Sequence, residues 1–578
     1  MFILNVIDYI KEKSEMKRTL KWWQKAVIYQ IYLRSFRDSD GDGVGDLNGV
    51  IEKIDYLKEL GIDAIWLSPY NRSPNADNGY DVSDYYAVSP EYGTLEDFRR
   101  LKDKAHSLGI RLIMDLVVNH TSDEHPWFVE SRKSKNSPYR DYYFWRKGKA
   151  DGQPPSDALN MFGGSAWEYD AATDEYCYHL FTKKQYDLNW ENPAVPEEVV
   201  KICRFWIEKG IDGFRIDCAN LFGKDTSFPS VGTGPDALEK RDALIFNNPK
   251  NHRYFHMLNE RVLKPYDVPA FGECSKIDIE EASLYSDPAR EELSGIIQFE
   301  HVKIDDGPNG EKWVDIPCDP RKLKASLSKW QKGLENKGWN CLYLDNHDQP
   351  RLISRFGDDK KYRETCGKMF ATLLMTLQGT PFVYQGSEIG MTNLNLTYDE
   401  IDDCEVKMVI EENNRTHAIS PEALLRAINK RGRDNSRTPM QWSAEKNAGF
   451  TSAERPWFKL NPNYKQINVE ESLARENSLL YYYRKAIALR KSEEVFTEGS
   501  FRELLADHPA AFVYERRCEN ARALILLNFT AQPQQLSSDV FEEYKNAALL
   551  LKNYPDSPSV EKNIPLRPFE ALVFKINN

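Results

Sequence analysis

Short apolar stretches rich in β-branched and aromatic residues alternate with amphipathic helical patterns along most of the chain. The helical patterns end at glycines that suit a helix C-cap, as in Glu52–Leu60 before Gly61 and Glu197–Lys209 before Gly210. Such alternation predicts a parallel sheet, and eight strands predict a closed (β/α)8 TIM barrel rather than an open doubly wound sheet. The predicted strands are Val27–Leu33, Ala64–Leu67, Arg111–Val118, Gly213–Asp217, Pro269–Gly272, Gly295–Phe299, Cys341–Leu344 and Pro381–Tyr384.

Two connections between predicted elements are longer than the ordinary loops of a barrel. Residues 120–192 are rich in Gly, Pro, Ser and aromatics, and they predict an inserted subdomain after the third strand. Residues 391–450 predict a second insertion, after the eighth strand. The barrel would then comprise residues 21–119 and 193–494.

The two ends of the chain differ from the barrel. Short strands without intervening helices predict a C-terminal antiparallel β domain over residues 495–578. Residues 1–20 are interpreted as an N-terminal extension without a chemical role, and Met16 within it is an alternative start to Met1. The apolar part of this extension is too short to span a bilayer and lacks the features of a signal peptide.

Charge and cysteine content exclude several classes of protein. The net charge of −12 argues against nucleic acid or an anionic membrane as a partner. The nine cysteines are scattered without a Cys-x-x-Cys pair, which argues against a disulfide scaffold or zinc site and favours the reducing cytoplasm. The 12% of aromatic residues suits sugar binding, although aromatics also fill cores. The sequence leaves the oligomeric state open.

The stretch Gly213–Asp217 (GFRID) places a cation and a carboxylate two residues apart at a strand end. A strand directs such residues to one face, so Arg215 and Asp217 should share a cavity, with Arg215 lowering the pKa of Asp217. An ionised, positioned carboxylate is what a glycosidase uses as nucleophile. The alternative is a buried structural ion pair.

Further polar residues lie where other predicted strands end. The third strand runs into Asp115–His120, the fifth into Glu273 and the seventh into Asp345–Asp348. The C-terminal ends of barrel strands meet at one rim, where catalytic groups lie. Three acids and two histidines at one rim favour a catalytic site over structural ion pairs, because buried charges are costly.

These segments resemble the α-amylase superfamily of retaining glycoside hydrolases, and within it the α-glucosidase and oligo-1,6-glucosidase group. The resemblance covers nearly the whole chain. It implies an exo-acting enzyme that hydrolyses terminal α-1,6, and also α-1,4, glucosidic bonds of short oligosaccharides. The residues that carry it are Asp115–His120 (DLVVNH), Gln185–Asn189 (QYDLN), Gly213–Asp217 (GFRID), Gly272-Glu273 (GE) and Asn346–Asp348 (NHD).

The resemblance also implies roles for single residues. Asp217 would be the nucleophile, Glu273 the general acid and base, and Asp348 a stabiliser of the transition state. We expect burial and the charges of the other two acids to raise the pKa of Glu273. The substrate-binding residues that the resemblance implies are Tyr80, Asp81, His120, Arg215, His347 and Arg437.

The segment Asn78–Asp81 follows the second strand. By the resemblance, Tyr80 stacks on the terminal glucose, while Asp81 and Arg437 hold its far hydroxyls. The alternative is a plain turn, because Asn-Gly is a common turn dipeptide.

An acidic loop follows the first strand. Its donors have the 1-3-5-7-9 spacing of a calcium loop, but the terminal glutamate and paired helices of an EF-hand are missing. We expect one structural Ca²⁺ or Mg²⁺, with a metal-free turn as the alternative. The candidate ligands are Asp38, Asp40, Asp42, the Val44 carbonyl and Asp46.

Three other functions compete with the glucosidase. Sucrose isomerases share fold and acids but carry an arginine-rich loop after the sixth strand, where Phe299–Asp306 has no arginine. Trehalose-6-phosphate hydrolase is a second alternative, although no decisive phosphate-binding cluster is visible. A transporter heavy chain, which binds without catalysis, would need a membrane span.

By the resemblance, we expect linkage preference to depend on Cys218, the residue after the predicted nucleophile. In the resembling group, valine at this position accompanies α-1,6 activity, and threonine or alanine accompanies α-1,4 activity. Cysteine is close to threonine in size and apolar like valine, so we expect mixed activity that leans toward α-1,6.

Overall fold

Eight parallel strands form a closed ring. The structure, a computed structural model, describes residues 20–577 except 163, 233, 235 and 309. The strand order is β13-β12-β11-β5-β2-β1-β15-β14, and a parallel bridge between Ile296 and Asn340 closes the ring. The predicted (β/α)8 barrel is therefore confirmed. Its strands are β1 (Ile28–Ile31), β2 (Ala64–Leu67), β5 (Arg111–Leu116), β11 (Gly213–Ile216), β12 (Ala270–Cys274), β13 (Gly295–Gln298), β14 (Cys341–Leu342) and β15 (Thr380–Tyr384).

The barrel strands are apolar because both of their faces are covered. Every residue of β1, β2 and β11 is buried, as expected for parallel strands between a packed interior and surrounding helices. The helices that follow the strands are α3 (Leu47–Leu60), α4 (Leu95–Ser107), α6 (Ala194–Glu208), α8 (Lys250–Leu258), α10 (Ile279–Ser286), α11 (Pro320–Leu334), α13 (Arg363–Thr376) and α17 (Leu479–Ser492).

Helix α3 begins five residues earlier than the predicted start at Glu52. The Asp46 carboxylate accepts a hydrogen bond of 2.7 Å from the backbone N–H of Gly49, which caps the helix N-terminus. Capping by an aspartate fixes where a helix begins, and the sequence interpretation had given Asp46 to a metal instead. The helix ends at Gly61 in the left-handed conformation (φ 96°), as predicted.

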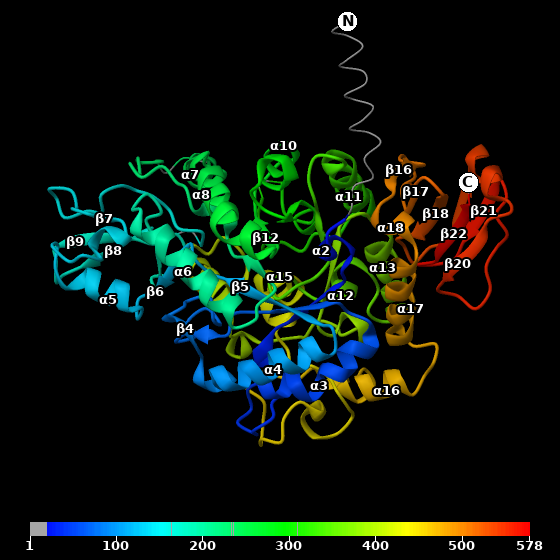
Figure 1. Ribbon diagram of the computed structural model, residues 1–578, viewed down its shortest axis with the longest axis horizontal. Helices are drawn as coiled ribbons and strands as arrows, with labels where there is room; N and C mark the ends of the chain where they lie inside the picture. Colours follow the sequence, from blue (N-terminus) through cyan, green and yellow to red (C-terminus); the bar gives the residue numbers. More distant parts are fainter. Residues whose placement is uncertain (1–19, 163, 233, 235, 309, 578) are drawn as a thin grey trace, which may run out of the picture.

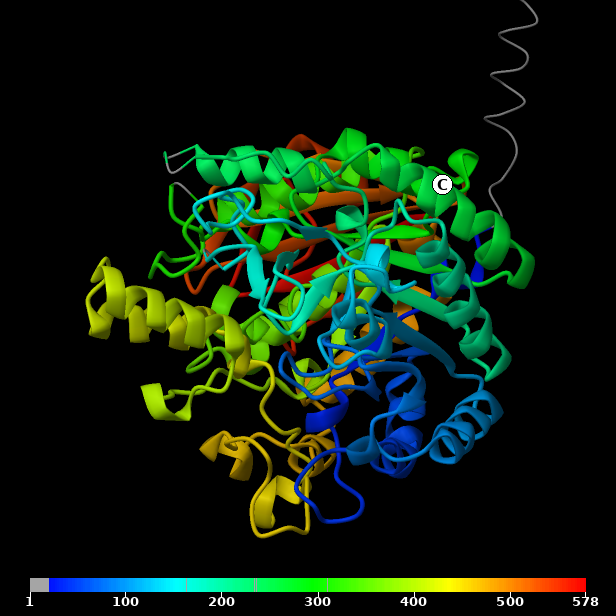
Figure 2. The ribbon, with the colours of Figure 1, turned by 90° about the vertical axis from the view of Figure 1, so that its left-hand side faces the viewer.

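The segment after β5 forms a separate subdomain, which lies at one end of the barrel (cyan in Figures 1 and 2). Its inner part is an antiparallel pair of β6 (His120–Ser122) and β10 (Gln185–Asp187). Its outer part is a three-stranded sheet in the order β7-β9-β8. These elements are β7 (Trp145–Arg146), β8 (Trp167–Asp170), β9 (Glu175–Tyr178) and the helix α5 (Pro126–Lys133).

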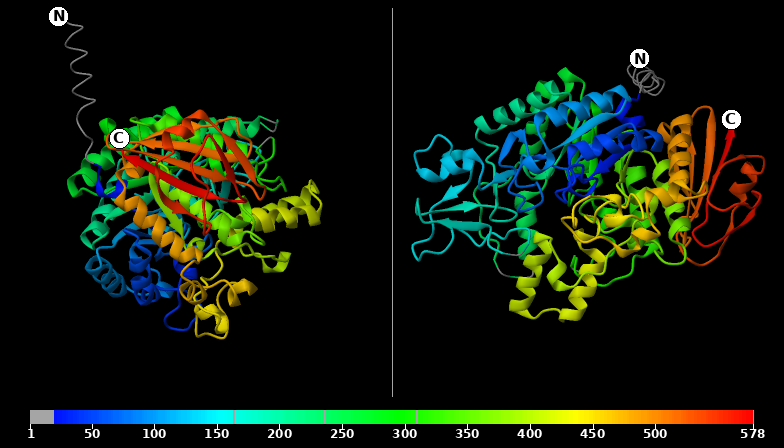
Figure 3. Two further views of the ribbon diagram at one scale, coloured as in Figure 1. Left: turned by 90° about the vertical axis from the view of Figure 1, so that its right-hand side faces the viewer. Right: turned by 90° about the horizontal axis from the view of Figure 1, so that it is seen from below.

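The segment after β15 contains a pair of helices, α14 (Cys404–Thr416) and α15 (Pro421–Arg431), which project from the barrel (yellow in Figures 2 and 3). A small apolar core holds the pair together, with Val406, Leu424 and Ile428 at its centre. The chain then returns along the barrel and continues through α17 into the C-terminal part.

The C-terminal part forms antiparallel sheets at the opposite end of the barrel from the subdomain (red in Figures 1 and 3). The larger sheet has the order β16-β17-β18-β22-β20, and β19 pairs with β21. The strands β16, β19 and β21 are short and alternate buried with exposed residues, so no apolar run in the sequence predicts them. The strands are β16 (Ser500–Leu504), β17 (Ala511–Arg517), β18 (Ala521–Asn528), β19 (Gln534–Ser537), β20 (Ala548–Lys552), β21 (Asn563–Leu566) and β22 (Ala571–Asn577).

The predicted N-terminal extension lies, apart from Leu20, outside the described residues. Within the described part of the chain, no helix combines the length and the apolar composition that crossing a bilayer requires.

Candidate active site

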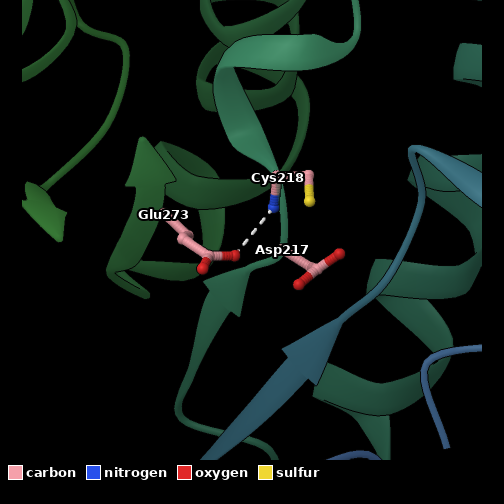
Figure 4. A group of neighbouring side chains, drawn as sticks. All are labelled: Asp217, Cys218 and Glu273. Atoms are coloured by element: carbon pink, nitrogen blue, oxygen red, sulfur yellow. Dashed lines mark hydrogen bonds between the residues drawn. The ribbon is translucent and has the colours of Figure 1, made fainter. Parts of the chain in front are cut away.

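Asp217 and Glu273 lie at the same level at the C-terminal ends of adjacent barrel strands. In the pairing of β11 with β12, Ile216 lies opposite Gly272, so Asp217 and Glu273 follow side by side. Carboxylate oxygens of the two residues lie within 4.8 Å of each other (Figure 4). This spacing suits a retaining glycosidase, whose two carboxyl groups lie about 5–5.5 Å apart, and not an inverting one, which needs room for a water molecule.

The buried Arg215 links three acids. Its Nη1 lies 2.8 Å from a carboxylate oxygen of Asp115 and equally 2.8 Å from one of Asp217. Its Nη2 lies 2.6 Å from Oε2 of Glu273. One guanidinium therefore orients both members of the acid pair. The GFRID motif predicts the contact with Asp217, but not the contact with Glu273.

Burial raises the pKa of both acids, to about 6 for Asp217 and about 8 for Glu273. Arg215 opposes the shift in both, whereas the charges of Asp217 and Asp348 add to it in Glu273. Asp217 therefore loses its proton before Glu273 does. Near neutral pH the pair holds one carboxylate and one carboxylic acid, which are the forms that nucleophile and general acid need.

Asp348 follows β14 and faces two arginines. Its Oδ1 accepts hydrogen bonds from Arg437 (3.0 Å) and Arg433 (3.3 Å). Burial raises the pKa of Asp348, but His347 and the two arginines outweigh it and hold the pKa well below its usual range. Asp348 is thus a fixed negative charge beside the acid pair.

His347 is fully buried and supports Tyr80. The two rings stack with centroids 5.2 Å apart, and the Tyr80 hydroxyl lies 2.6 Å from Nε2 of His347. Gln30 Nε2 lies 2.8 Å from the other ring nitrogen, Nδ1. Both ring nitrogens are engaged here, so His347 holds Tyr80 in place, and its contact with sugar hydroxyls stays a prediction.

His120 and Gln185 come from the paired strands β6 and β10, and both line the catalytic cavity. Gln185 Nε2 lies 3.2 Å from Nε2 of His120 and also donates to the Tyr80 carbonyl, at 3.2 Å. Burial lowers the pKa of His120, so the imidazole is neutral at pH 7. The inserted subdomain therefore supplies one wall of the site.

Asp81 does not reach the cavity. Its carboxylate is fully buried and accepts hydrogen bonds from Ser73 Oγ (2.9 Å) and from the backbone N–H groups of Ala76 (2.8 Å) and Asp77 (3.0 Å). Asp77, and not Asp81, lines the cavity. The signal was present in the sequence, because the Asn78-Gly79 turn brings Asp77 and Tyr80 together as its first and last residues, joined by a hydrogen bond of 3.0 Å.

Arg437, like Asp81, does not line the cavity that it was predicted to line. It is buried and binds Asp348, Asp403 and the His347 carbonyl. Arg433 lines the cavity and contacts Asp77 at 3.5 Å. Arg433 and Arg437 lie four residues apart in the sequence, and only the path of the chain decides which of them lines the cavity.

Cys218 lines the cavity next to the acid pair. Its backbone adopts the left-handed conformation (φ 46°), which is uncommon for a residue with a side chain. This turn directs the Cys218 N–H toward Oε2 of Glu273, at 3.2 Å (Figure 4). Cys218 therefore contacts Glu273 through its backbone and also lines the cavity.

The catalytic cavity has a volume of about 320 Å³, within the range of small-molecule sites. Apolar side chains of the subdomain and of the loop after β13 form part of its wall: Met161, Phe162, Phe181 and Phe299. Lys303 also lines it, and no ion pair of this lysine is present among the described residues. Lys312, by contrast, is 2.7 Å from Glu405.

In the acidic loop after β1, Asp38, Asp40 and Asp42 come together, with carboxylate oxygens within 4.8 Å of one another. Asp46, the predicted last ligand, is engaged elsewhere. Besides capping α3, its carboxylate accepts a hydrogen bond of 2.7 Å from the Ser39 N–H. The N–H of Val44 donates a hydrogen bond of 2.7 Å to Asp42. The carbonyl oxygen of Val44 remains a candidate metal ligand.

An eight-stranded parallel barrel with two carboxyl groups this close at the ends of neighbouring strands defines a glycoside hydrolase of the retaining type. The chain belongs to the alpha-amylase family, because the family model described as "Alpha amylase, catalytic domain" matches residues 30–499.

Known proteins similar to the chain have related activities. It is 49% identical over 559 residues to an oligo-1,6-glucosidase of Bacillus cereus, which covers 96% of this chain and 99% of the relative. It is 44% identical over 567 residues to a trehalose-6-phosphate hydrolase of Bacillus subtilis (strain 168), covering 96% and 98%. Among solved structures, isomaltulose synthase from Klebsiella sp. LX3 has a TM-score of 0.92 at 40% identity, covering 96% of this chain and 100% of the other.

Proposed function

We propose that the protein is a retaining α-glucosidase that releases glucose from the ends of short α-1,6-linked oligosaccharides, with weaker α-1,4 activity. The observation that carries the mechanism is the separation of Asp217 and Glu273. The relatives named oligo-1,6-glucosidase, 49% and 48% identical to the chain, favour this linkage.

The reaction would proceed in two displacements. The Asp217 carboxylate attacks C1 of the terminal glucose while the Glu273 carboxylic acid protonates the glycosidic oxygen, which leaves as an alcohol. Glu273, now ionised, takes a proton from water, and the water oxygen displaces Asp217 from C1. Asp348 would stabilise the positive charge that develops on the ring.

Specificity for a chain end would come from Asp77 and Arg433. Together with Asp348, these residues offer acceptors and donors to hydroxyls of the terminal glucose at one part of the cavity wall. Tyr80, held flat by His347, would cover an apolar face of the sugar ring.

The direct test is to incubate the protein with isomaltose, maltose, sucrose, trehalose and trehalose-6-phosphate and to resolve products by NMR. We expect glucose from isomaltose, less from maltose, and the α-anomer as the first product. Release of the β-anomer first would overturn retention, and conversion of sucrose into an isomer would favour the isomerase.

A second candidate function is hydrolysis of a phosphorylated disaccharide, and Lys303 is the observation that favours it. This lysine has no ion pair among the described residues and lines the cavity that the leaving sugar would occupy. If a phosphate binds there, Lys303→Met should lower kcat/KM for trehalose-6-phosphate and leave isomaltose unchanged. Absence of any turnover of trehalose-6-phosphate would remove this candidate.

We also propose a structural Ca²⁺ or Mg²⁺ in the acidic loop. Oxygens of Asp38, Asp40 and Asp42 suit a hard cation, and no lysine or arginine in the described part of the chain forms an ion pair with them. Asp46, which also holds the loop through its hydrogen bonds, and the Val44 carbonyl remain the further candidate ligands. The nine cysteines, all free, support a reducing compartment such as the cytoplasm.

A further inference from the structure

The inserted subdomain contains a second cavity, of about 230 Å³, none of whose lining residues is shared with the catalytic cavity. Strand β10 separates the two. Its Gln185 lines the catalytic cavity and the next residue, Tyr186, lines the second one, as expected from the alternation of side chains along a strand. The second cavity therefore lies one strand away from the substrate.

Aromatic rings form part of its wall. Tyr186 stacks on Phe128 with centroids 4.0 Å apart, and Trp145 lies parallel to Phe128 at 5.8 Å. Tyr169 is 49% exposed, so part of its ring is open to a molecule in the cavity. The stacked rings are buried and line the cavity without a free face, so among these aromatics the exposed ring of Tyr169 is the one that can cover an apolar face of a pyranose.

The wall of this cavity carries as many positively charged side chains as negatively charged ones. Two of the acids are already paired, Asp123 with Lys184 at 2.7 Å and Asp170 with Arg132 at 3.2 Å. Equal numbers of cations and anions disfavour an ionic ligand, whereas the donors and acceptors they supply suit a neutral molecule with many hydroxyls. The charged residues are Asp123, Arg132, Glu168, Asp170, Lys183 and Lys184.

Several polar groups of the wall are free to bind such a molecule. Among the described residues, the side chains of Glu168 and Lys183 form no hydrogen bond or ion pair, and the Tyr186 hydroxyl has no hydrogen-bond partner. Tyr186 is 7% exposed, so its stacked ring presents only an edge to the cavity.

We propose that this cavity is a second saccharide-binding site, which takes one sugar ring of a neutral oligosaccharide. Its volume is below the roughly 300–1,000 Å³ of sites for larger ligands, in keeping with a single ring. The choice of a glucose oligomer as ligand rests on the proposed function. The existence of the cavity does not depend on the proposed function, because none of its lining residues belongs to the catalytic site.

The test counts binding sites in the absence of turnover. Isomaltotriose is titrated by calorimetry into the Asp217→Asn chain, with and without Glu168→Ala and Tyr169→Ala together. We expect two equivalents bound before and one after the double substitution, with the affinity of the remaining site unchanged. Tyr266→Ala, at an exposed tyrosine in α9 (Lys264–Tyr266), is the matched control and should keep two equivalents.

Should the double variant fail to fold, Lys183→Ala should still weaken the second equivalent. A single equivalent in the parent, or two equivalents that survive all these substitutions, would overturn the proposal. Failure of the proposed function would look different, because it would appear as no release of glucose from isomaltotriose by the unaltered chain.

Discussion

Arg433 and Asp77 meet in the wall of the catalytic cavity, with Nη2 of the arginine 3.5 Å from Oδ1 of the aspartate, although 356 residues separate them in the chain. The pair joins the loop after β2 to the insertion after β15. Because Arg433 also contacts Asp348, a change in the pair reaches the catalytic acids directly.

Replacing Asp77 by Asn should lower kcat/KM on isomaltose by at least about 100-fold, because it removes a charged acceptor that would hold hydroxyls of the terminal glucose. Steady-state kinetics will check this. Asp81→Asn is the control. It should lower Tm by disturbing the loop, with a loss in kcat/KM of less than about tenfold. If Asp81→Asn is the more damaging of the two for catalysis, the assignment of Asp77 is wrong.

Asp217→Asn and Glu273→Gln should each reduce kcat on isomaltose by several orders of magnitude without unfolding the chain. A nitrophenyl glucoside distinguishes the two roles, because its leaving group needs no proton. Glu273→Gln should therefore form the covalent intermediate with this substrate, visible by mass spectrometry, whereas Asp217→Asn should not. Near-normal turnover by a folded Asp217→Asn protein is incompatible with the mechanism.

The pH profile of kcat/KM should be bell-shaped. Activity needs ionised Asp217, whose pKa burial raises to about 6, so it falls as the pH drops below that value. It also needs protonated Glu273, whose pKa burial and the neighbouring acids raise to about 8, so it falls again above that value. In Glu273→Gln the alkaline limb should vanish for a nitrophenyl substrate. An alkaline limb that persists would assign it to another group.

Thorough chelation should lower Tm while activity at moderate temperature survives, because the acidic loop lies outside the acid cluster and a metal that binds only the native state stabilises it. Asp42→Ala should abolish this sensitivity. Asp46→Ala should cost about 1 kcal/mol by removing the cap of α3, with or without metal. A Tm that chelation leaves unchanged, with no metal detected by elemental analysis, would refute the site.

Cys218→Val should raise the ratio of α-1,6 to α-1,4 activity and Cys218→Ala should lower it. Differences of one methyl group in a pocket are worth about 1–3 kcal/mol, so shifts of about tenfold are measurable. Because φ at this position is 46°, valine should also lower Tm. A ratio that neither substitution moves would place the selection of linkage in the inserted segments.

The sequence by itself determined the barrel and the acid cluster. The signals for the barrel are local or periodic: they are apolar runs that alternate with glycine-capped helical patterns. All eight predicted strands overlap those observed. Asp217, Glu273 and Asp348 follow from the same rule, because the C-terminal ends of barrel strands meet wherever the barrel closes.

Only the tertiary structure decided which polar groups of the loops face the cavity. Asp77 and Asp81 lie four residues apart in the sequence, as do Arg433 and Arg437, and in each pair one residue lines the cavity while the other supports the chain. Loop side chains have no period that fixes their direction, so their orientation depends on contacts between distant segments. The same holds for Asp46. Its position in the acidic loop predicts a metal ligand, and only the structure shows that its carboxylate also caps α3.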